Sequence, residues 1–190
     1  YGVKLHVRSA FSWVPGTWVS EEPSMENAII SAVTHDTSEA KMTVSGVPDQ
    51  PGVAAKLFRS LADADVNVDM IVQNVSDAGA TDISFTLPHE QVSAATATVD
   101  ALVAEIGAKG VVTDTGIGRV SLTGAGMQTN PGVAATMFET LSTSGINIEM
   151  ISTSAIRISC VVREDQAEQA VTVLHAAFEL DKAPANRSDI

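Results

Sequence analysis

The order of apolar and polar positions along this chain occurs twice. Residues 51–71 read PGVAAKLFRSLADADVNVDMI and residues 131–151 read PGVAATMFETLSTSGINIEMI, with ten of the twenty-one positions identical. In each copy apolar residues first recur at helical spacing and then alternate with polar ones, which predicts an amphipathic helix followed by a strand. A repeat of this length defines the unit of a fold. We therefore expect two copies of one supersecondary unit, with the function located where the copies meet.

The pattern around the first copy predicts the element order βαββαβ. Alternation at Met42 and Val44 indicates a strand, the turn GVPDQPG follows at 46–52, and a helix is expected over 51–64 and a strand over 66–73. The inward residues of that strand are expected to be Val66, Val68, Met70 and Val72. The later elements are expected to be a loop at 74–80, a strand at 83–87 ended by Pro88, a helix at 89–106 and a strand at 110–114.

The second copy has the same order but lacks a fourth strand. A strand around Val120 and Leu122 is followed by a helix, two strands and a second helix at about 165–179. Its inward residues are expected to be Val133, Met137, Phe138 and Leu141 on the first helix, and Ile146, Ile148, Met150, Ile156, Ile158 and Cys160 on the strands. The apolar run 27–35 stands alone before a polar linker at 36–41, and an unpaired sheet edge would invite aggregation. We therefore expect 27–35 to complete the second sheet, so that the first unit is inserted in the second.

Both ends of the chain fall outside the repeat. Residues 1–24 begin with an alternation typical of a strand and contain a turn at Pro15. We interpret them as the last strand and exit turn of another domain. Residues 182–190 are polar, and we expect them to form a disordered tail.

Composition and charge limit the classes of function and partner that this chain can have. The 190 residues are 45% hydrophobic but only 4% aromatic, which predicts an aliphatic core, and the net charge of −12 argues against a nucleic acid or an anionic membrane as partner. No run of about 18 apolar residues exists, so no membrane span is expected. A single cysteine, Cys160, and the lack of an export signal favour a reducing cytoplasm.

Catalytic and metal chemistry find little support in the residue types. The four histidines are scattered without ligand spacing, so no metal site is expected. Phosphoryl transfer needs a phosphate cradle and a cationic clamp, and the weak glycine pattern at 124–127 is better explained as a turn. Cys160 occupies an inward strand position, which indicates a buried core thiol.

The two helix starts suit the binding of a small amino acid. Small side chains leave space there, and backbone amides together with the helix dipole favour a carboxylate. The small residues are Gly52 and Ala54 in the first copy and Gly132 and Ala134 in the second. Asn67 and Asn147 begin equivalent strands and can donate and accept hydrogen bonds at once. On residue type alone, the glycine and alanine positions are better explained as ordinary turn and helix-start residues.

Three stretches resemble the tandem ACT region of an aspartate kinase: SEAKMTVSGVPDQPGVAAKLFRSLADADVNVDMIVQNVS, VSLTGAGMQTNPGVAATMF and NIEMISTSAIRIS. VRSAFSWVPGTWV resembles the end of that family's amino-acid-kinase domain. The resemblance implies an α+β fold of two ferredoxin-like βαββαβ ACT domains. Each would be a mainly antiparallel four-stranded sheet with two helices on one face, and the first unit would be inserted in the second. The implied domains are 37–115, and 25–36 plus 116–181, after a remnant of the kinase domain at 1–24.

The resemblance implies a regulatory role. The chain would bind threonine, with lysine as a further candidate, for allosteric feedback inhibition of the ATP-dependent phosphorylation of aspartate. It would carry no catalytic residue and no cofactor, because ATP and Mg²⁺ belong to the kinase domain of the full enzyme. Its partners would be that catalytic domain or alpha subunit and a second copy of the chain in a homodimer. In the heterotetrameric branch, an internal start such as Met25 gives a separate regulatory (beta) subunit.

The residues that the resemblance assigns to effectors come from both copies. The threonine site would consist of Asp49, Gly52, Val53, Ala54, Gln73, Asn147 and Ile148. A second, related site would consist of Asn67, Val68, Met127, Asn130, Gly132, Val133, Ala134 and Ser154, and Ser76 and Ser84 would be further regulatory positions.

Two positions depart from the family's pattern. Ala155 stands in STSAIRIS where a glutamate is usual, which bears on lysine sensing, and Ser84 stands where threonine is common. Two other interpretations are compatible with the sequence: an ACT-type module that only dimerises and binds no ligand, and an amino-acid sensor of a different enzyme.

Overall fold

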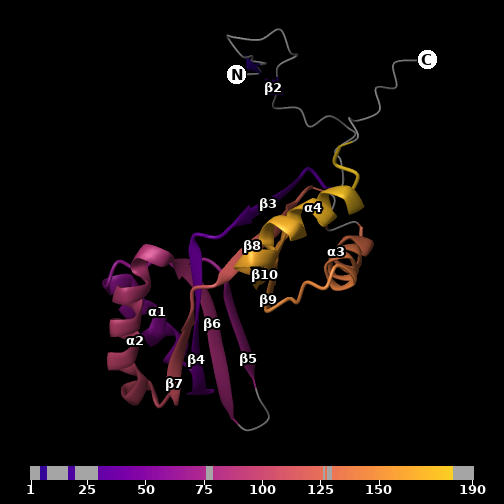
Figure 1. The fold of residues 1–190 in the computed structure, drawn as a ribbon. Helices are drawn as coiled ribbons and strands as arrows, with labels where there is room; N and C mark the ends of the chain where they lie inside the picture. The colour runs from indigo at the N-terminus through magenta and orange to yellow at the C-terminus, as the bar shows by residue number, and fades with distance from the viewer. Residues whose placement is uncertain are drawn as a thin grey trace, which may run out of the picture.

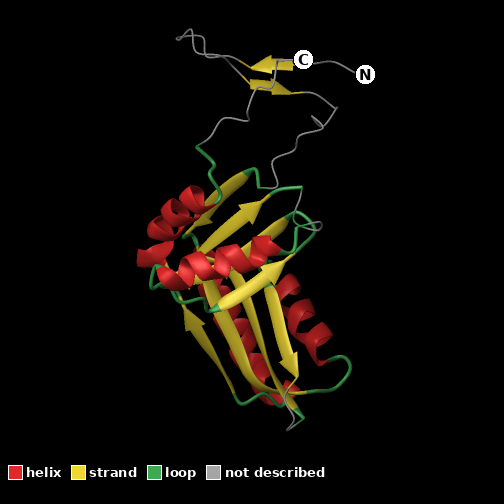
Figure 2. Ribbon diagram, turned by 90° about the vertical axis from the view of Figure 1, so that its right-hand side faces the viewer, coloured by secondary structure: helices red, strands yellow, loops and turns green. Residues whose placement is uncertain are grey.

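A computed structural model describes residues 5–7, 17–19, 30–75, 79–125, 127 and 130–181. In this part of the chain lie two four-stranded antiparallel sheets, each covered on one face by two helices (Figures 1 and 2). This is the α+β architecture that the sequence predicts. A short antiparallel pair, β1 (Leu5–Val7) with β2 (Thr17–Val19), stands apart from both sheets.

The first unit contains four strands in the spatial order β5-β6-β4-β7. Its elements are β4 (Glu39–Pro48), α1 (Val53–Asp63), β5 (Ile71–Val75), β6 (Ala80–Pro88), the 3-10 turn η1 (His89–Gln91), α2 (Val92–Ile106) and β7 (Gly110–Asp114). Its aliphatic core lies between the sheet and the two helices and includes Met42, Leu57, Leu61, Phe85 and Val99.

The second unit contains four strands in the order β3-β8-β10-β9. Its elements are β3 (Ala32–Asp36), β8 (Ile117–Thr123), α3 (Gly132–Thr143), β9 (Met150–Thr153), β10 (Arg157–Arg163), the 3-10 turn η2 (Glu164–Gln166) and α4 (Ala167–Ala177). Strand β3 pairs with β8, from Ala32 opposite Thr123 to Asp36 opposite Arg119. The strand that precedes the first unit therefore completes the sheet of the second unit, as predicted from the missing fourth strand.

The two copies of the repeat turn from helix to strand in the same way. After α1 the amide of Val66 donates to the carbonyl oxygen of Leu61 (3.0 Å), and after α3 the amide of Ile146 donates to that of Leu141 (2.9 Å). This six-to-one hydrogen bond needs a left-handed residue just beyond the helix. Asp65 supplies it in the first copy (φ 57°) and Gly145 in the second (φ 72°).

The predicted element boundaries differ from the observed ones at several places. The strand expected at 27–35 is Ala32–Asp36, and the linker expected at 36–41 is much shorter, because β4 already begins at Glu39. The helices expected at 51–64, 89–106 and 165–179 are Val53–Asp63, Val92–Ile106 and Ala167–Ala177, the last two preceded by 3-10 turns. The strand expected at 66–73 is Ile71–Val75, so the loop expected at 74–80 is also shorter.

The alternating burial expected before β5 is nevertheless correct. Val66 and Met70 are buried, Val68 is half-buried, and Asn67 and Asp69 are exposed. No strand forms before Ile71, although the amide of Asp69 already donates to the carbonyl oxygen of Thr86 at 3.0 Å.

In the second copy the equivalent strand begins only at Met150, and one inward assignment is wrong. Ile156 lies in the bend before β10 and is 58% exposed. Ile158 and Cys160, further along β10, are buried as expected. The predictions for residues 1–4, 8–16, 20–29 and 182–190 and for Ser76 lie outside the described residues.

The faces of the two sheets that carry no helices, here called the helix-free faces, meet within the chain. In the first sheet this face is marked by Lys41 paired with Thr86 and by Thr43 paired with Ser84. The contact is made by an apolar cluster from both units: Met70, Ile117, Met150 and Val161, with Val72 packed against it. Met70 and Met150 occupy the same position in the two copies of the repeat, so the junction joins equivalent segments of the two units.

Candidate functional site

The start of helix α1 is open to solvent. Gly52 is its N-cap with a φ of 95°; within the part of the chain that the structure describes, no side chain caps the helix and a Cβ added to Gly52 would meet no atom within 4 Å. Asp49 is exposed, and its amide donates to the carbonyl oxygen of Gly79 (3.1 Å). Val53 and Ala54 are partly buried against the first core. This helix start therefore offers backbone donors and free space, which a carboxylate requires.

The start of helix α3 is similar but not identical. Helix α3 begins at Gly132 itself, with Pro131 as its N-cap, and among the described residues no side chain caps it and no atom lies within 4 Å of a Cβ added to the exposed Gly132. Val133, by contrast, is only 6% exposed and belongs to the second core, while Met127 and Ala134 pack partly against it. The amide of Val133 donates to the carbonyl oxygen of Asn130 (3.2 Å). The side chain of Val133 is therefore enclosed by the core, and its amide already has an acceptor.

The two asparagines that precede the equivalent strands are both exposed. The amide of Asn67 donates to Oε1 of Gln91 at 2.8 Å, and the neighbouring Val68 packs partly against the first core. Asn147 lines a cavity of about 460 Å³. The other residues that line this cavity are Phe138, Ser142, Gly145, Ile146 and Ile148.

The halves of the predicted threonine site belong to different units. All the residues that line the cavity at Asn147 come from the second unit. Gln73 is exposed on β5, opposite Ile83, and belongs to the first unit together with Gly52. The structure therefore places the two halves in different units, and none of the described residues of the first-unit half lines the cavity at Asn147.

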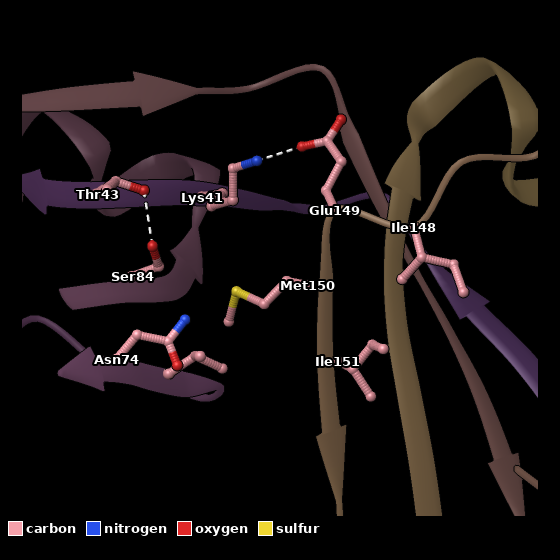
Figure 3. Close-up of a pocket in the computed structure, with 9 residues that line it drawn as sticks. Lys41, Thr43, Asn74, Ser84, Ile148, Glu149, Met150 and Ile151 are labelled. Atoms are coloured by element: carbon pink, nitrogen blue, oxygen red, sulfur yellow. Dashed lines mark hydrogen bonds and ion pairs between the residues drawn. The ribbon is translucent and has the colours of Figure 1, made fainter. Parts of the chain in front are cut away.

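Ser84, predicted as a regulatory position, and Ser154, predicted for the second effector site, lie near the junction of the two units. Ser84 lies on the helix-free face with its Oγ 2.9 Å from Oγ1 of Thr43, and both line a cavity of about 380 Å³ between the two units (Figure 3). Ser154 lines a different cavity, of about 470 Å³, together with Asp69 and Arg119. Its amide donates to the carbonyl oxygen of Arg157 at 2.7 Å.

One acidic residue in each copy crosses the junction. Asp69 of the first unit pairs with Arg119 on β8 of the second, and Glu149 of the second unit pairs with Lys41 on β4 of the first. Asp69 and Glu149 are equivalent in the repeat. The two pairs therefore tie each unit to the helix-free face of the other.

Each crossing pair is extended into a cluster of charges. Arg119 also contacts Glu39 (Nη2 to Oε1, 3.0 Å) and Asp36 (Nη2 to Oδ2, 3.3 Å). Arg163 contacts Glu149 (Nη1 to Oε1, 3.3 Å) and Asp114 (Nη1 to Oδ2, 2.7 Å). These residues come from both units, and the side chains of Arg119 and Glu39 are only 14% and 11% exposed. Partial burial makes such charge pairs stronger than those on an open surface.

The protonation of two carboxyl groups in these clusters is shifted by their contacts. Hydrogen bonds from the hydroxyl and amide of Ser38 lower the pKa of Asp36, and Arg119 lowers it further. The amide of Gly116 lowers the pKa of Asp114, with a smaller contribution from Arg163. Both carboxylates are therefore held in the ionised form that the clusters need.

The described residues contain no group of three or more histidine, cysteine, aspartate or glutamate side chains that could hold a metal ion. Burial raises the pKa of the Cys160 thiol to about 12, which fits an unreactive core position. No helix in the described part of the chain is long and apolar enough to cross a membrane.

Sequence reasoning missed the charged residues of the junction. Glu39 and Lys41 lie in the stretch that was predicted to be a polar linker, and the strand pattern around Val120 does not show that the second face of its sheet is also covered. A usable signal was the acidic residue that both copies keep before Met70 and Met150. An acid retained in both copies at an equivalent place, on a face opposite the core, indicates a shared contact.

Comparison with known proteins identifies the repeated unit. The family described as the ACT domain matches residues 42–102 and 120–178, which is one match for each unit. Among curated proteins, an aspartokinase of Mycolicibacterium smegmatis is 51% identical over 185 residues, covering 95% of this chain and 44% of that protein. An aspartate kinase of Pseudomonas fluorescens is 48% identical over 191 residues, covering 100% of this chain and 46% of that protein. The chain thus spans less than half the length of these relatives.

Solved structures of aspartate kinase subunits match most of this chain. The regulatory subunit of aspartate kinase from Thermus thermophilus, in a ligand-free form, is 37% identical with a TM-score of 0.75, and the match covers 79% of this chain and 99% of that subunit. A chain in a crystal structure of aspartokinase alpha and beta subunits is 42% identical with a TM-score of 0.75 and is covered to 99%. The chain therefore belongs to the ACT domain family, as a regulatory region of the aspartate kinase type.

Proposed function

We propose that this chain senses threonine, with lysine as a further candidate effector, and controls an aspartate kinase catalytic domain or subunit by feedback inhibition in the cytoplasm. The catalytic part would bind ATP and Mg²⁺ and phosphorylate aspartate. The near-complete match to regulatory subunits of aspartate kinase supports the regulatory role. The proposal that the chain binds an amino acid rests on the pair of open helix starts at Gly52 and Gly132, each with free space beside an uncapped helix.

The threonine carboxylate would bind the amides at the start of α1. Helix N-termini carry unpaired amides and a partial positive charge, and charge-assisted hydrogen bonds are the strong ones. Asp49 would accept from the ligand's ammonium or hydroxyl, and Gln73 would close the first-unit side. The backbone at Asn147 and Ile148 would supply the other side. The repeat offers a second, related site at the start of α3, with Asn67 and Ser154.

A second copy of the chain would complete these sites. The two half-sites belong to unlike units, and the cavity at Asn147 is lined from one unit alone. Strands β5 and β9 are the edges of their sheets, and each exposes an isoleucine: Ile71 is 49% exposed and Ile151 is 42% exposed. Exposed edges with apolar side chains favour pairing with another chain. We propose a homodimer in which a first unit lies beside the second unit of the partner.

The experiment is a thermal melt with and without L-threonine on the wild type, Gln73→Ala, Ala54→Leu and the control Ala62→Leu. Ala62 is exposed in the last turn of α1, so the control carries the same substitution away from the helix start. Ligand at about 100 times its dissociation constant stabilises a protein by roughly 2.7 kcal/mol. We expect that gain in the wild type and the control, and a much smaller one in Gln73→Ala and Ala54→Leu.

Two outcomes would contradict the proposal. If millimolar threonine leaves the melting temperature of the wild type unchanged while sedimentation shows a dimer, the chain is a dimerisation module that binds no threonine. If both site variants shift as the wild type does, threonine binds elsewhere. Comparison of the unliganded melts shows whether Ala54→Leu, which enlarges a partly buried residue, has disturbed the fold.

A further inference from the structure

The cavity between the two units has the chemistry of a binding site, and the threonine proposal does not use it. It has a volume of about 380 Å³, within the range of about 300–1,000 Å³ found for small-molecule pockets. Figure 3 shows Lys41, Thr43, Ser84 and Asn74 of the first sheet facing Glu149 and Met150 of the second unit. The cavity therefore exists only where the two units come together.

Its charges are balanced and come from opposite sides. Two of its lining residues are charged: Lys41 lies on β4 of the first unit and Glu149 precedes β9 of the second. Their side chains form an ion pair across the cavity and are only 19% and 18% exposed. A site with one cation and one anion favours neither a net anion nor a net cation. It suits a ligand that carries both charges.

Neutral polar groups lie beside the ion pair. Thr43 and Ser84 share a hydrogen bond of 2.9 Å between their hydroxyls, so the pair keeps donor and acceptor capacity for a further partner. Asn74 adds a carboxamide, which can both donate and accept. Val72 and Met150 supply apolar surface from the cluster at the junction. A few polar groups against an apolar wall is the usual composition of a small-molecule site.

We propose that this cavity binds the zwitterion of an α-amino acid with a short aliphatic side chain. Its carboxylate would bind Lys41 and the hydroxyls of Thr43 and Ser84, and its ammonium would bind Glu149. The ligand would replace one ion pair with two. Glu149 keeps a cation when Lys41 turns to the ligand, because Arg163 Nη1 lies 3.3 Å from its Oε1. The aliphatic side chain would lie against Val72 and Met150.

A ligand here would be coupled to the helix-start site through strand β5. Val72 and Asn74 line the cavity, whereas Gln73 between them points to the other face of the strand. Ile148, next to Asn147, lines both this cavity and the one at Asn147. If a ligand in one cavity displaces either segment, the affinity of the other site for its ligand changes, and such coupling is reciprocal.

The test is calorimetric titration of the chain with L-valine as the probe, beside valinamide, which lacks the carboxylate, and N-acetyl-L-valine, which lacks the ammonium. The variants are Lys41→Met and Glu149→Gln, with Lys56→Met as the control. Lys56 also pairs with a glutamate, Glu105, but on the exposed helical side of the first unit. Losing one charge-assisted contact of about 1.5–3 kcal/mol weakens binding roughly tenfold or more.

We expect L-valine to bind the wild type and Lys56→Met equally, and to bind Lys41→Met and Glu149→Gln at least about tenfold more weakly. Valinamide and N-acetyl-L-valine should also bind the wild type at least about tenfold more weakly than L-valine does. Titration of Ala54→Leu separates this site from the helix-start site, because it should bind L-valine normally even if threonine binding fails. The proposal is overturned if L-valine does not bind, if it binds both charge variants as it binds the wild type, or if Ala54→Leu abolishes its binding.

Discussion

Arg119 offers the sharpest test of how the two units are held together. It lies on β8 of the second unit and contacts Asp36 of its own unit and Glu39 and Asp69 of the first. Glu39 is 9% exposed, and its Oε2 is buried without a hydrogen-bond partner among the described residues. The contact with Arg119 Nη2 at 3.0 Å therefore compensates the free-energy cost of burying the Glu39 carboxylate.

The substitution Arg119→Met keeps most of the side-chain volume but removes the charge. Leaving a buried charge without its partner costs about 3–5 kcal/mol. Because Glu39 keeps slight contact with solvent, we expect the lower end, about 3 kcal/mol. For a chain of this size each kcal/mol lowers the melting temperature by about 2–4 °C, so the expected loss is roughly 6–12 °C. The measurement is a thermal melt followed by far-UV circular dichroism.

Two further variants make the result decisive. In Arg119→Met with Glu39→Gln the buried charge is gone, so we expect the loss to be smaller than the sum of the two single losses. The control is Arg59→Met, since Arg59 forms an exposed pair with Asp63 (3.6 Å) one turn along α1 and should change stability by no more than about 0.5 kcal/mol. The reasoning is refuted if Arg119→Met has the same melting temperature as the control Arg59→Met. It is also refuted if the double variant loses as much stability as the two single variants together.

Three other predictions follow from the same structure. The pKa values of Asp36 and Asp114 are lowered in the folded state, so the contribution of these carboxylates to the free energy of unfolding is complete above the ordinary value of 3.8 and is lost as the pH falls through the lowered values. Asp36→Asn with Asp114→Asn should flatten the fall in stability below pH 3.8, and a fall as steep as that of the wild type would count against this prediction. Cys160, with its pKa raised to about 12, should react with a thiol reagent at pH 8 only after unfolding, and rapid labelling of the native chain would contradict its burial. Gly118→Ala should cost about 1–3 kcal/mol in a denaturant melt, because its new Cβ would lie 2.8 Å from Cβ of Ala167, whereas Gly110→Ala on β7, with no atom within 4 Å, should be tolerated.

The sequence was most informative where one face of an element is buried. The helical spacing of Met137 and Leu141 and the alternation at Met42 and Val44 predicted buried positions that the structure confirms, because burial on one face imposes a period of 3.6 or 2 on the chain. The missing fourth strand of the second copy predicted the pairing of β3 with β8, since a sheet edge needs a partner.

The sequence was least informative where tertiary contacts override local pattern. The extended segment before β5 is alternating but forms no regular ladder until Ile71, so its pattern predicted a strand five residues too early. Ile156 reads as part of an alternating strand, yet it lies in the bend after Ser154. The cluster around Arg119 could not be predicted, because its members are far apart in the chain and the packing of the second face leaves no period in the sequence.

Hydrogen–deuterium exchange with and without L-threonine tests the proposed sensing function most directly. The account predicts slower exchange in two separate segments when threonine binds: 49–56 at the start of α1 and 145–149 before β9. Both segments should be protected together, because each supplies one half of the same site. Protection of neither segment at saturating threonine, or of one without the other, would contradict the account.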